Sequence, residues 1–137
     1  MTADARDAQL NELINGRQAA LDRVAAKAHT AGAKALLLIG SLGRGGGDAF
    51  SDLDLIVVPG PAFAGLDLSR MFADDVLAQL EVPHNAPTGG TFHTTCLTVA
   101  GTVLWVDLFI WPLDTAAIAV DATAVFDNVG VPHSEDF

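Results

Sequence analysis

Two apolar segments joined by a glycine-rich stretch constrain the fold most strongly. Residues 34–40, KALLLIG, form a short apolar run that ends in glycine, and residues 52–58, DLDLIVV, alternate at first and then become wholly apolar. Runs of this length and composition predict buried β-strands. The stretch between them, SLGRGGGDAFS, is therefore expected to be a loop that connects two strands.

Helical spacing is found on either side of these strands. Over residues 5–31, apolar residues recur at steps of three and four, which predicts a long N-terminal helix that Gly16 could divide in two. Residues 66–80, LDLSRMFADDVLAQL, show similar spacing and predict a second helix. A short third helix is expected near 113–119.

Residues 91–111, TFHTTCLTVAGTVLWVDLFIW, predict a β-hairpin. They are rich in β-branched and aromatic residues, and Ala100-Gly101 supplies a tight turn. Residues 122–128, ATAVFDN, predict a last strand. We therefore expect an α+β chain that forms one domain over 1–137. Helices would pack against a mixed sheet, in a core at about 34–128 that carries the candidate site.

The charge distribution limits the partners. The formal net charge is −10, and all seven Lys and Arg residues lie within the first 70 positions. Binding to a long nucleic acid requires clustered Lys and Arg, so we do not expect such a partner. An acidic excess is also ordinary in soluble proteins. The balance favours a small neutral or cationic partner.

Membrane and secretion signals are not evident in the sequence. No apolar run reaches the ~18 residues that a membrane span needs, and the N-terminus lacks the layout of a signal peptide. The single Cys96 cannot form an internal disulfide, which is typical of a reducing compartment. A soluble cytoplasmic protein is expected.

The glycine-rich loop is a candidate phosphate site. Gly40 lets the backbone approach a ligand closely, the Ser41 hydroxyl can donate to a phosphate oxygen, and Arg44 is the one basic residue of the loop. Neither the P-loop motif nor the dinucleotide-binding fingerprint is present. Because glycine-rich turns between strands are common, the loop alone does not establish a site.

Three aspartates are candidate metal ligands. Asp52 and Asp54 are two apart on an expected strand, so their side chains share one face. They could simply be two solvated acids at a strand edge. Asp107, however, interrupts an apolar strand, where an unpaired carboxylate is costly. If the two strands are neighbours, the three carboxylates converge beyond the loop, as two-metal phosphoryl or nucleotidyl transfer requires.

These elements, in this order, resemble the DNA polymerase β-type nucleotidyltransferase superfamily. The most similar members are the small bacterial ones, which include aminoglycoside nucleotidyltransferases and the minimal nucleotidyltransferases of toxin–antitoxin pairs. The resemblance extends over residues 20–128. The residues that carry it are Gly40-Ser41, Arg44-Gly45, Ser51-Asp52-Leu53-Asp54-Leu55 and Val106-Asp107-Leu108.

The resemblance implies a nucleotidyltransferase fold and a Mg²⁺-dependent reaction. AMP would be transferred from ATP, or another nucleotide from its triphosphate, to a hydroxyl group of a small molecule or protein. Gly40 and Ser41 would hold the phosphates, with Arg44 nearby. Two Mg²⁺ ions would be held by three aspartates, Asp52, Asp54 and Asp107. Asp107 would also help the acceptor hydroxyl to lose its proton, and pyrophosphate would leave.

Many members of that superfamily continue into a helical C-terminal region that helps to bind the acceptor, and no such region is evident here. We expect a second copy, a helical HEPN-type protein or a further part of a longer enzyme to complete the acceptor site. The alternative is a non-catalytic, antitoxin-like module that acts through a HEPN-type partner.

Overall fold

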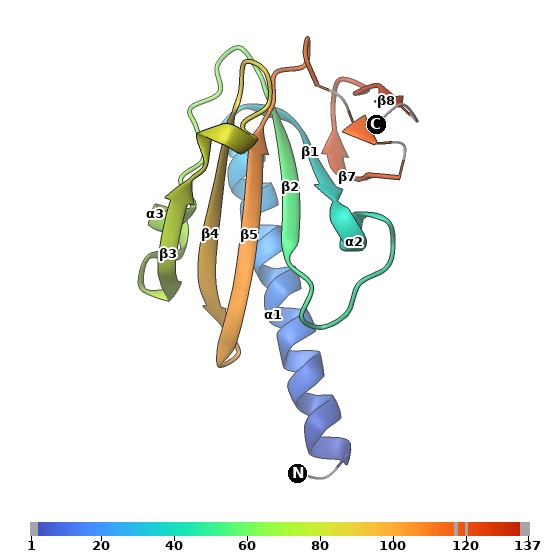
Figure 1. The fold of residues 1–137 in the computed structure, drawn as a ribbon, viewed down its shortest axis with the longest axis vertical. Coiled ribbons are helices and arrows are strands. Elements are labelled where there is room, and N and C mark those ends of the chain that lie inside the picture. Colours follow the sequence, from blue (N-terminus) through green and yellow to red (C-terminus); the bar gives the residue numbers. More distant parts are fainter. Residues whose placement is uncertain (1–2, 117, 120, 135–137) are drawn as a thin grey trace.

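A six-stranded mixed sheet with a long helix behind it organises the molecule (Figure 1). The computed structural model describes residues 3–116, 118–119 and 121–134. The helices are α1 (Ala3–Thr30), α2 (Gly40–Gly43) and α3 (Leu68–Phe72), with 3₁₀ turns η1 (Ala73–Asp75) and η2 (Pro83–Asn85). The strands are β1 (Ala33–Ile39), β2 (Leu53–Pro59), β3 (Val76–Glu81), β4 (Thr91–Val99), β5 (Thr102–Ile110), β6 (Ile118–Ala119), β7 (Thr123–Asp127) and β8 (His133–Ser134). The expected α+β class is confirmed.

The sheet has the order β3-β4-β5-β2-β1-β7. β2 and β5 run parallel, whereas every other neighbouring pair in this sheet is antiparallel. The predicted hairpin is confirmed as β4 and β5. Its turn residues Ala100 and Gly101 have φ angles of 49° and 79°, as a tight hairpin turn of matching twist requires.

Both faces of the central strands are covered, which explains their continuous apolar sequences. On one face, Leu36 and Leu55 are fully buried against Val24 and Ala28 of α1. On the other face, a second cluster lies under the C-terminal segment, whose Ile118 and Val131 pack against the sheet. The buried sheet residues of this second cluster are Ala35, Leu37, Ile56 and Val58.

The N-terminal helix α1 is continuous through Gly16, so the expected division does not occur. A Cβ at Gly16 would overlap Cγ1 of Val99, which shows that glycine permits α1 to approach the end of β4 closely. The part of α1 that precedes this contact extends beyond the sheet (Figure 1), and Ile14 is 41% exposed. Within the described residues, no helix is both long and apolar enough to cross a membrane.

The predicted helix over 66–80 is wrong beyond its first turns. Asp67 caps the short helix α3 by accepting hydrogen bonds from the N–H groups of Ser69 and Arg70. The chain then turns through Ala73, at a φ of 35°, and continues as the edge strand β3. Pairing with β4 satisfies the backbone groups on one side of this strand and leaves its leucines exposed, so tertiary pairing overrides the helical spacing.

The short helix expected near 113–119 is not formed by the described residues. The chain makes a turn in which Thr115 N–H donates to the Pro112 carbonyl, and then enters β6. Ile118 of β6 is fully buried against the sheet, and β6 pairs with β8, a strand that was not expected. Residue 117 lies outside the described residues. The strand predicted at 122–128 is confirmed as β7.

Candidate functional site

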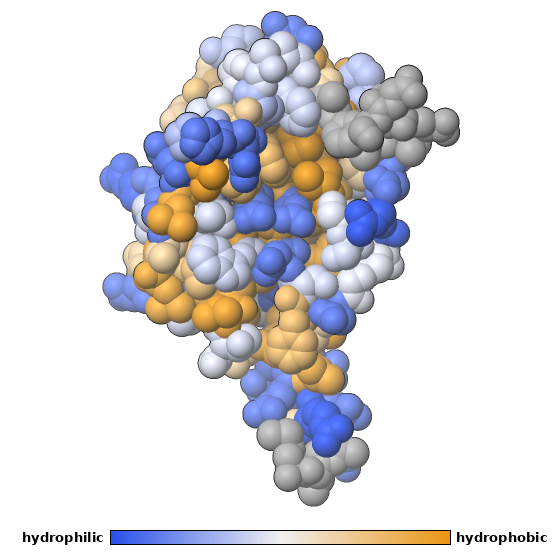
Figure 2. Space-filling view, in the orientation of Figure 1, coloured by the Kyte–Doolittle hydropathy of each residue, from blue (hydrophilic) through white to orange (hydrophobic). Residues whose placement is uncertain are grey.

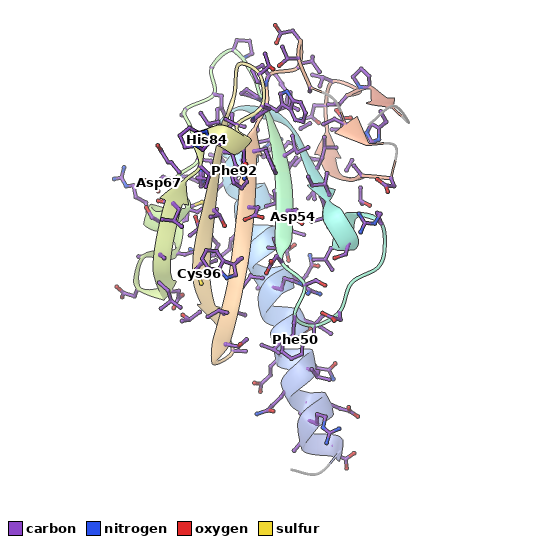
Figure 3. The ribbon with its side chains drawn as sticks, in the orientation of Figure 1. Phe50, Asp54, Asp67, His84, Phe92 and Cys96 are labelled. Atoms are coloured by element: carbon purple, nitrogen blue, oxygen red, sulfur yellow. The ribbon has the colours of Figure 1, made fainter. Side chains whose placement is uncertain are left out.

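Two of the three candidate carboxylates lie side by side on neighbouring strands. The parallel register of β2 and β5 sets Asp54 directly opposite Asp107, so the condition that these two strands be neighbours is met. Asp52 precedes β2 and is exposed. Figure 3 places Asp54 on the face of the sheet away from α1, and Figure 2 shows a hydrophilic area in the middle of that face, bordered by hydrophobic side chains.

The three carboxyl groups repel one another when they are ionised. Burial raises the pKa of Asp54 to about 6, with further contributions from a hydrogen bond with Asp107 and from the charges of Asp107 and Asp52. The pKa of Asp52 is also raised, by partial desolvation of its carboxyl group, although the residue as a whole is exposed, and by the charge of Asp107. A backbone hydrogen bond from Trp105 opposes the shift. An added cation would relieve this repulsion.

Thr94 fixes the orientation of Asp107 from the other side. β4 and β5 pair Thr94 with Asp107, and the Thr94 Oγ1 donates to Asp107 Oδ1 at 2.5 Å. Asp107 therefore lies between a hydroxyl donor and the second carboxyl group. Thr94 was not among the predicted site residues, although the predicted turn at Ala100-Gly101 already sets its pairing with Asp107.

Gly40 packs directly against the carboxylate of Asp54. β1 ends at Ile39, which pairs with Asp54, and the next residue has a φ of +70°. A Cβ at Gly40 would overlap the Asp54 Oδ2. Gly40-Ser41 thus falls where the first strand ends, as expected, and the loop begins beside the carboxylate pair.

Hydrogen bonds hold the glycine-rich loop in one shape. Arg17 of α1 donates through Nη1 to the carbonyl groups of Asp48 and Ser51, at 2.5 and 3.1 Å. A Cβ at Gly47 would lie 2.8 Å from the Ser51 Oγ and 3.3 Å from the Ser41 Oγ, so both hydroxyls converge on this glycine. The sequence carries no signal for the role of Arg17, which depends on where α1 lies.

Arg44 is the expected site residue that the structure does not connect with the others. It lies at the C-terminal end of α2, where its backbone N–H donates to the Gly40 carbonyl at 3.2 Å. Its side chain is exposed, and no hydrogen bond or ion pair joins its guanidinium to any described residue. Arg44 is therefore close in sequence to the carboxylate pair but makes no contact with it.

The carboxylates do not form a complete metal cage by themselves. Among the described residues, no group of three or more His, Cys, Asp or Glu side chains is arranged to hold a metal ion. The donors are carboxylate oxygens, which Mg²⁺ prefers, and Mg²⁺ usually takes only one or two protein carboxylates together with phosphate oxygens and water. Asp54 and Asp107 fit that smaller requirement in chemistry and position.

Comparisons with known protein families, with curated proteins and with solved structures found no match for this chain.

Proposed function

We propose that the chain is a Mg²⁺-dependent nucleotidyltransferase of the DNA polymerase β type, most simply an adenylyltransferase. The observation that carries the proposal is the contact between Gly40 and Asp54, with Asp107 directly opposite Asp54 on the parallel strand. A backbone that can approach a phosphate closely therefore lies beside two oxygen ligands suited to Mg²⁺. The consumption of ATP agrees with the expected cytoplasmic location.

The nucleotide would lie along the loop that begins at Gly40. The Ser41 hydroxyl, which converges with that of Ser51 on Gly47, would donate to a phosphate oxygen. Arg44 is exposed and free to reach the same phosphates, where its guanidinium would offset their charge. The substrate is ATP or another nucleoside triphosphate.

The reaction would be an in-line displacement at the α-phosphorus. The acceptor hydroxyl oxygen forms a bond to that phosphorus, the bond to the bridging oxygen breaks, and pyrophosphate leaves. Asp107, oriented by Thr94, accepts the hydroxyl proton. Asp54 and Asp107 would hold Mg²⁺ together with phosphate oxygens and water, and the nearby Asp52 would join them as a third ligand if two ions bind. The bound metal would neutralise the phosphate charge and lower the pKa of the hydroxyl.

Calorimetric titration tests the proposal. Mg²⁺ with ATP should bind the wild-type chain, and Asp54→Asn or Asp107→Asn should weaken binding at least tenfold, because each removes a ligand charge. The matched control is Asp114→Asn, which changes an exposed aspartate outside the cluster. No binding to the wild-type chain, or equal binding to all variants, would overturn the proposal.

Exposed hydrophobic side chains favour a second candidate, a non-catalytic module that binds a partner. Phe50, Leu77 and Leu80 are 67%, 57% and 55% exposed. A HEPN-type helical protein or a second copy would cover these side chains. Purification from the native host distinguishes the nucleotidyltransferase from the partner-binding module. Recovery of the chain as a lone monomer that binds ATP would contradict the partner-binding module.

A further inference from the structure

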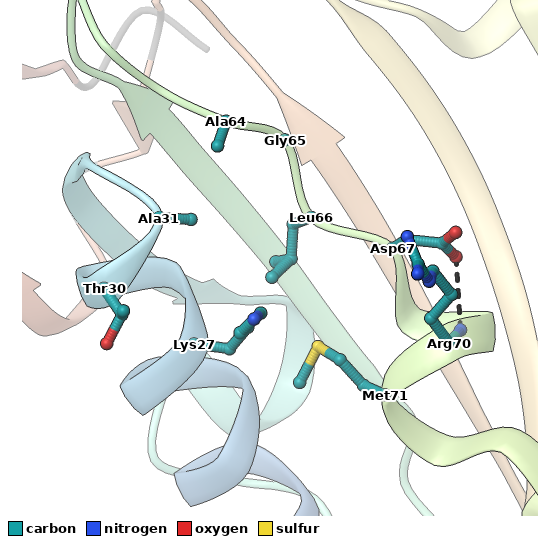
Figure 4. A pocket seen from close by; sticks show the side chains of 9 residues that line it. All are labelled: Lys27, Thr30, Ala31, Ala64, Gly65, Leu66, Asp67, Arg70 and Met71. Atoms are coloured by element: carbon teal, nitrogen blue, oxygen red, sulfur yellow. Dashed lines mark hydrogen bonds between the residues drawn. The ribbon is translucent and has the colours of Figure 1, made fainter.

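A cavity lies on the opposite side of the sheet from the aspartates. It has a volume of about 680 Å³ and opens between the C-terminal end of α1, the loop before α3 and α3 itself (Figure 4). Leu66 at its wall belongs to the same buried cluster as α1, whereas Asp54 points to the other face. The volume is in the range typical of small-molecule sites, ~300–1,000 Å³.

Basic side chains gather at this cavity in a strongly acidic chain. Lys27 and Arg70 line it, and Arg23 lies one helical turn before Lys27. The Arg23 guanidinium is already engaged, 4.4 Å above the Phe72 ring. In contrast, no hydrogen bond or ion pair joins the Lys27 ammonium to the residues that the structure describes, and Figure 4 shows this side chain directed into the cavity.

Two backbone N–H groups at the cavity have no acceptor among the described residues. Gly65 and Leu66 line the cavity, and their N–H groups donate to none of the described residues. Gly65 also has open space where a side chain would be. The one carboxylate at the rim, Asp67, accepts from Ser69 Oγ at 2.6 Å and from the Ser69 N–H at 3.0 Å. It serves the cap of α3 and also interacts with the charge of Arg70, and its own charge disfavours a highly charged polyphosphate.

The remaining wall is apolar. Ala31, Ala64, Leu66 and Met71 supply the apolar part of its lining. We propose that this cavity binds a small molecule with an apolar body and a single anionic group, a carboxylate or a phosphate monoester. Lys27, Arg70 and the free amides would hold the anionic group, and the apolar wall would hold the body. This site is separate from the aspartate cluster and does not depend on the nucleotidyltransferase proposal.

Amide NMR titration with three matched probes tests the proposal. Phenyl phosphate and benzoate should shift the Gly65 and Leu66 amide signals, while neutral benzyl alcohol should bind at least tenfold more weakly. The ratio between the two anions identifies which headgroup the site prefers. Equal binding of benzyl alcohol, or shifts confined to other residues, would overturn the proposal.

The variants separate this site from general electrostatics. Lys27→Gln with Arg70→Gln should weaken phenyl phosphate binding about tenfold, because two charge-assisted contacts are lost. Lys34→Gln removes another exposed positive charge, outside the cavity, and should leave the affinity unchanged. If the double variant binds phenyl phosphate as tightly as the wild-type chain does, the proposed site is contradicted. This conclusion is independent of the titration with Mg²⁺ and ATP, which tests the nucleotidyltransferase proposal.

Discussion

The two faces of strand β2 carry opposite energetic roles. Leu55 is fully buried against the cluster beneath α1, whereas its neighbour Asp54 is partly buried among other carboxylates on the opposite face. Burial of the leucine stabilises the fold, and burial of the ionised aspartate opposes it. Successive residues of one strand thus show that the burial of apolar side chains can hold charged groups in an arrangement that would be unfavourable by itself.

The largest expected effect is on the apolar face. Leu55→Ala should lower the free energy of unfolding by about 3 kcal/mol, because it removes a fully buried side chain and leaves a cavity. Urea unfolding followed by circular dichroism measures the change. Leu77→Ala, at a leucine that is 57% exposed, should change it by less than ~0.5 kcal/mol. Similar losses in both variants would contradict the described burial.

A smaller effect is expected where the loop meets the aspartate. Gly40→Ala should cost about 2 kcal/mol, since the new Cβ combines an unfavourable φ with overlap of the Asp54 carboxylate. Gly45→Ala is the matched control, because Gly45 has a similar φ of +78° but open space around it. Its cost should be about 1 kcal/mol. In an Asp54→Ala background the two costs should become equal, and a persistent difference would refute the contact.

On the carboxylate face, substitution should stabilise the fold instead of destabilising it. The folded-state pKa of Asp54, about 6, is above its unfolded value of 3.8. Its stabilising contribution is therefore present below pH ~4 and is lost as the pH rises through ~6. Asp54→Asn should raise the free energy of unfolding by about 1 kcal/mol at pH 8, after allowance for solvent screening, and by almost nothing at pH 3.5. Urea unfolding at both values measures this, and destabilisation at pH 8 would contradict it.

The smallest expected effect concerns the support of Asp107. Thr94→Val removes the hydroxyl donor with little change of shape and should cost about 0.5 kcal/mol at pH 8. Thr98→Val on the same strand is the control, because its hydroxyl makes only a 3.4 Å contact with the Asp75 carbonyl. Thermal unfolding of both variants gives the comparison. Equal stability of the two would show that the hydrogen bond to Asp107 contributes nothing.

Local patterns predicted the elements whose neighbours are close in sequence. The hairpin followed from Ala100-Gly101 and the strands on either side, and that turn also determines the pairing of Thr94 with Asp107. The position of Gly40 at the end of β1 followed from the apolar run before it. The joining of Asp54 and Asp107 could be stated only as a condition, because no local pattern determines which strands become neighbours.

The features that were missed depend on distant parts of the chain. The spacing of residues 66–80 is compatible with a helix, but β4 offers an unpaired edge that the sequence of 76–81 alone does not reveal. The hydrogen bonds from Arg17 to the loop likewise depend on where α1 crosses the sheet. Gly16 was interpreted as a helix breaker, whereas its role is to make room for Val99.

The parallel ladder between β2 and β5 has a consequence for the order of folding. β1 with β2, and β4 with β5, are antiparallel pairs between consecutive strands, so each can form by closing a loop locally. The β2–β5 contact must instead close the long segment that contains α3 and β3, which makes it the slower step. Asp54 and Asp107 are therefore expected to meet late, and their mutual repulsion would then act on the final assembly of the sheet and not on its separate halves.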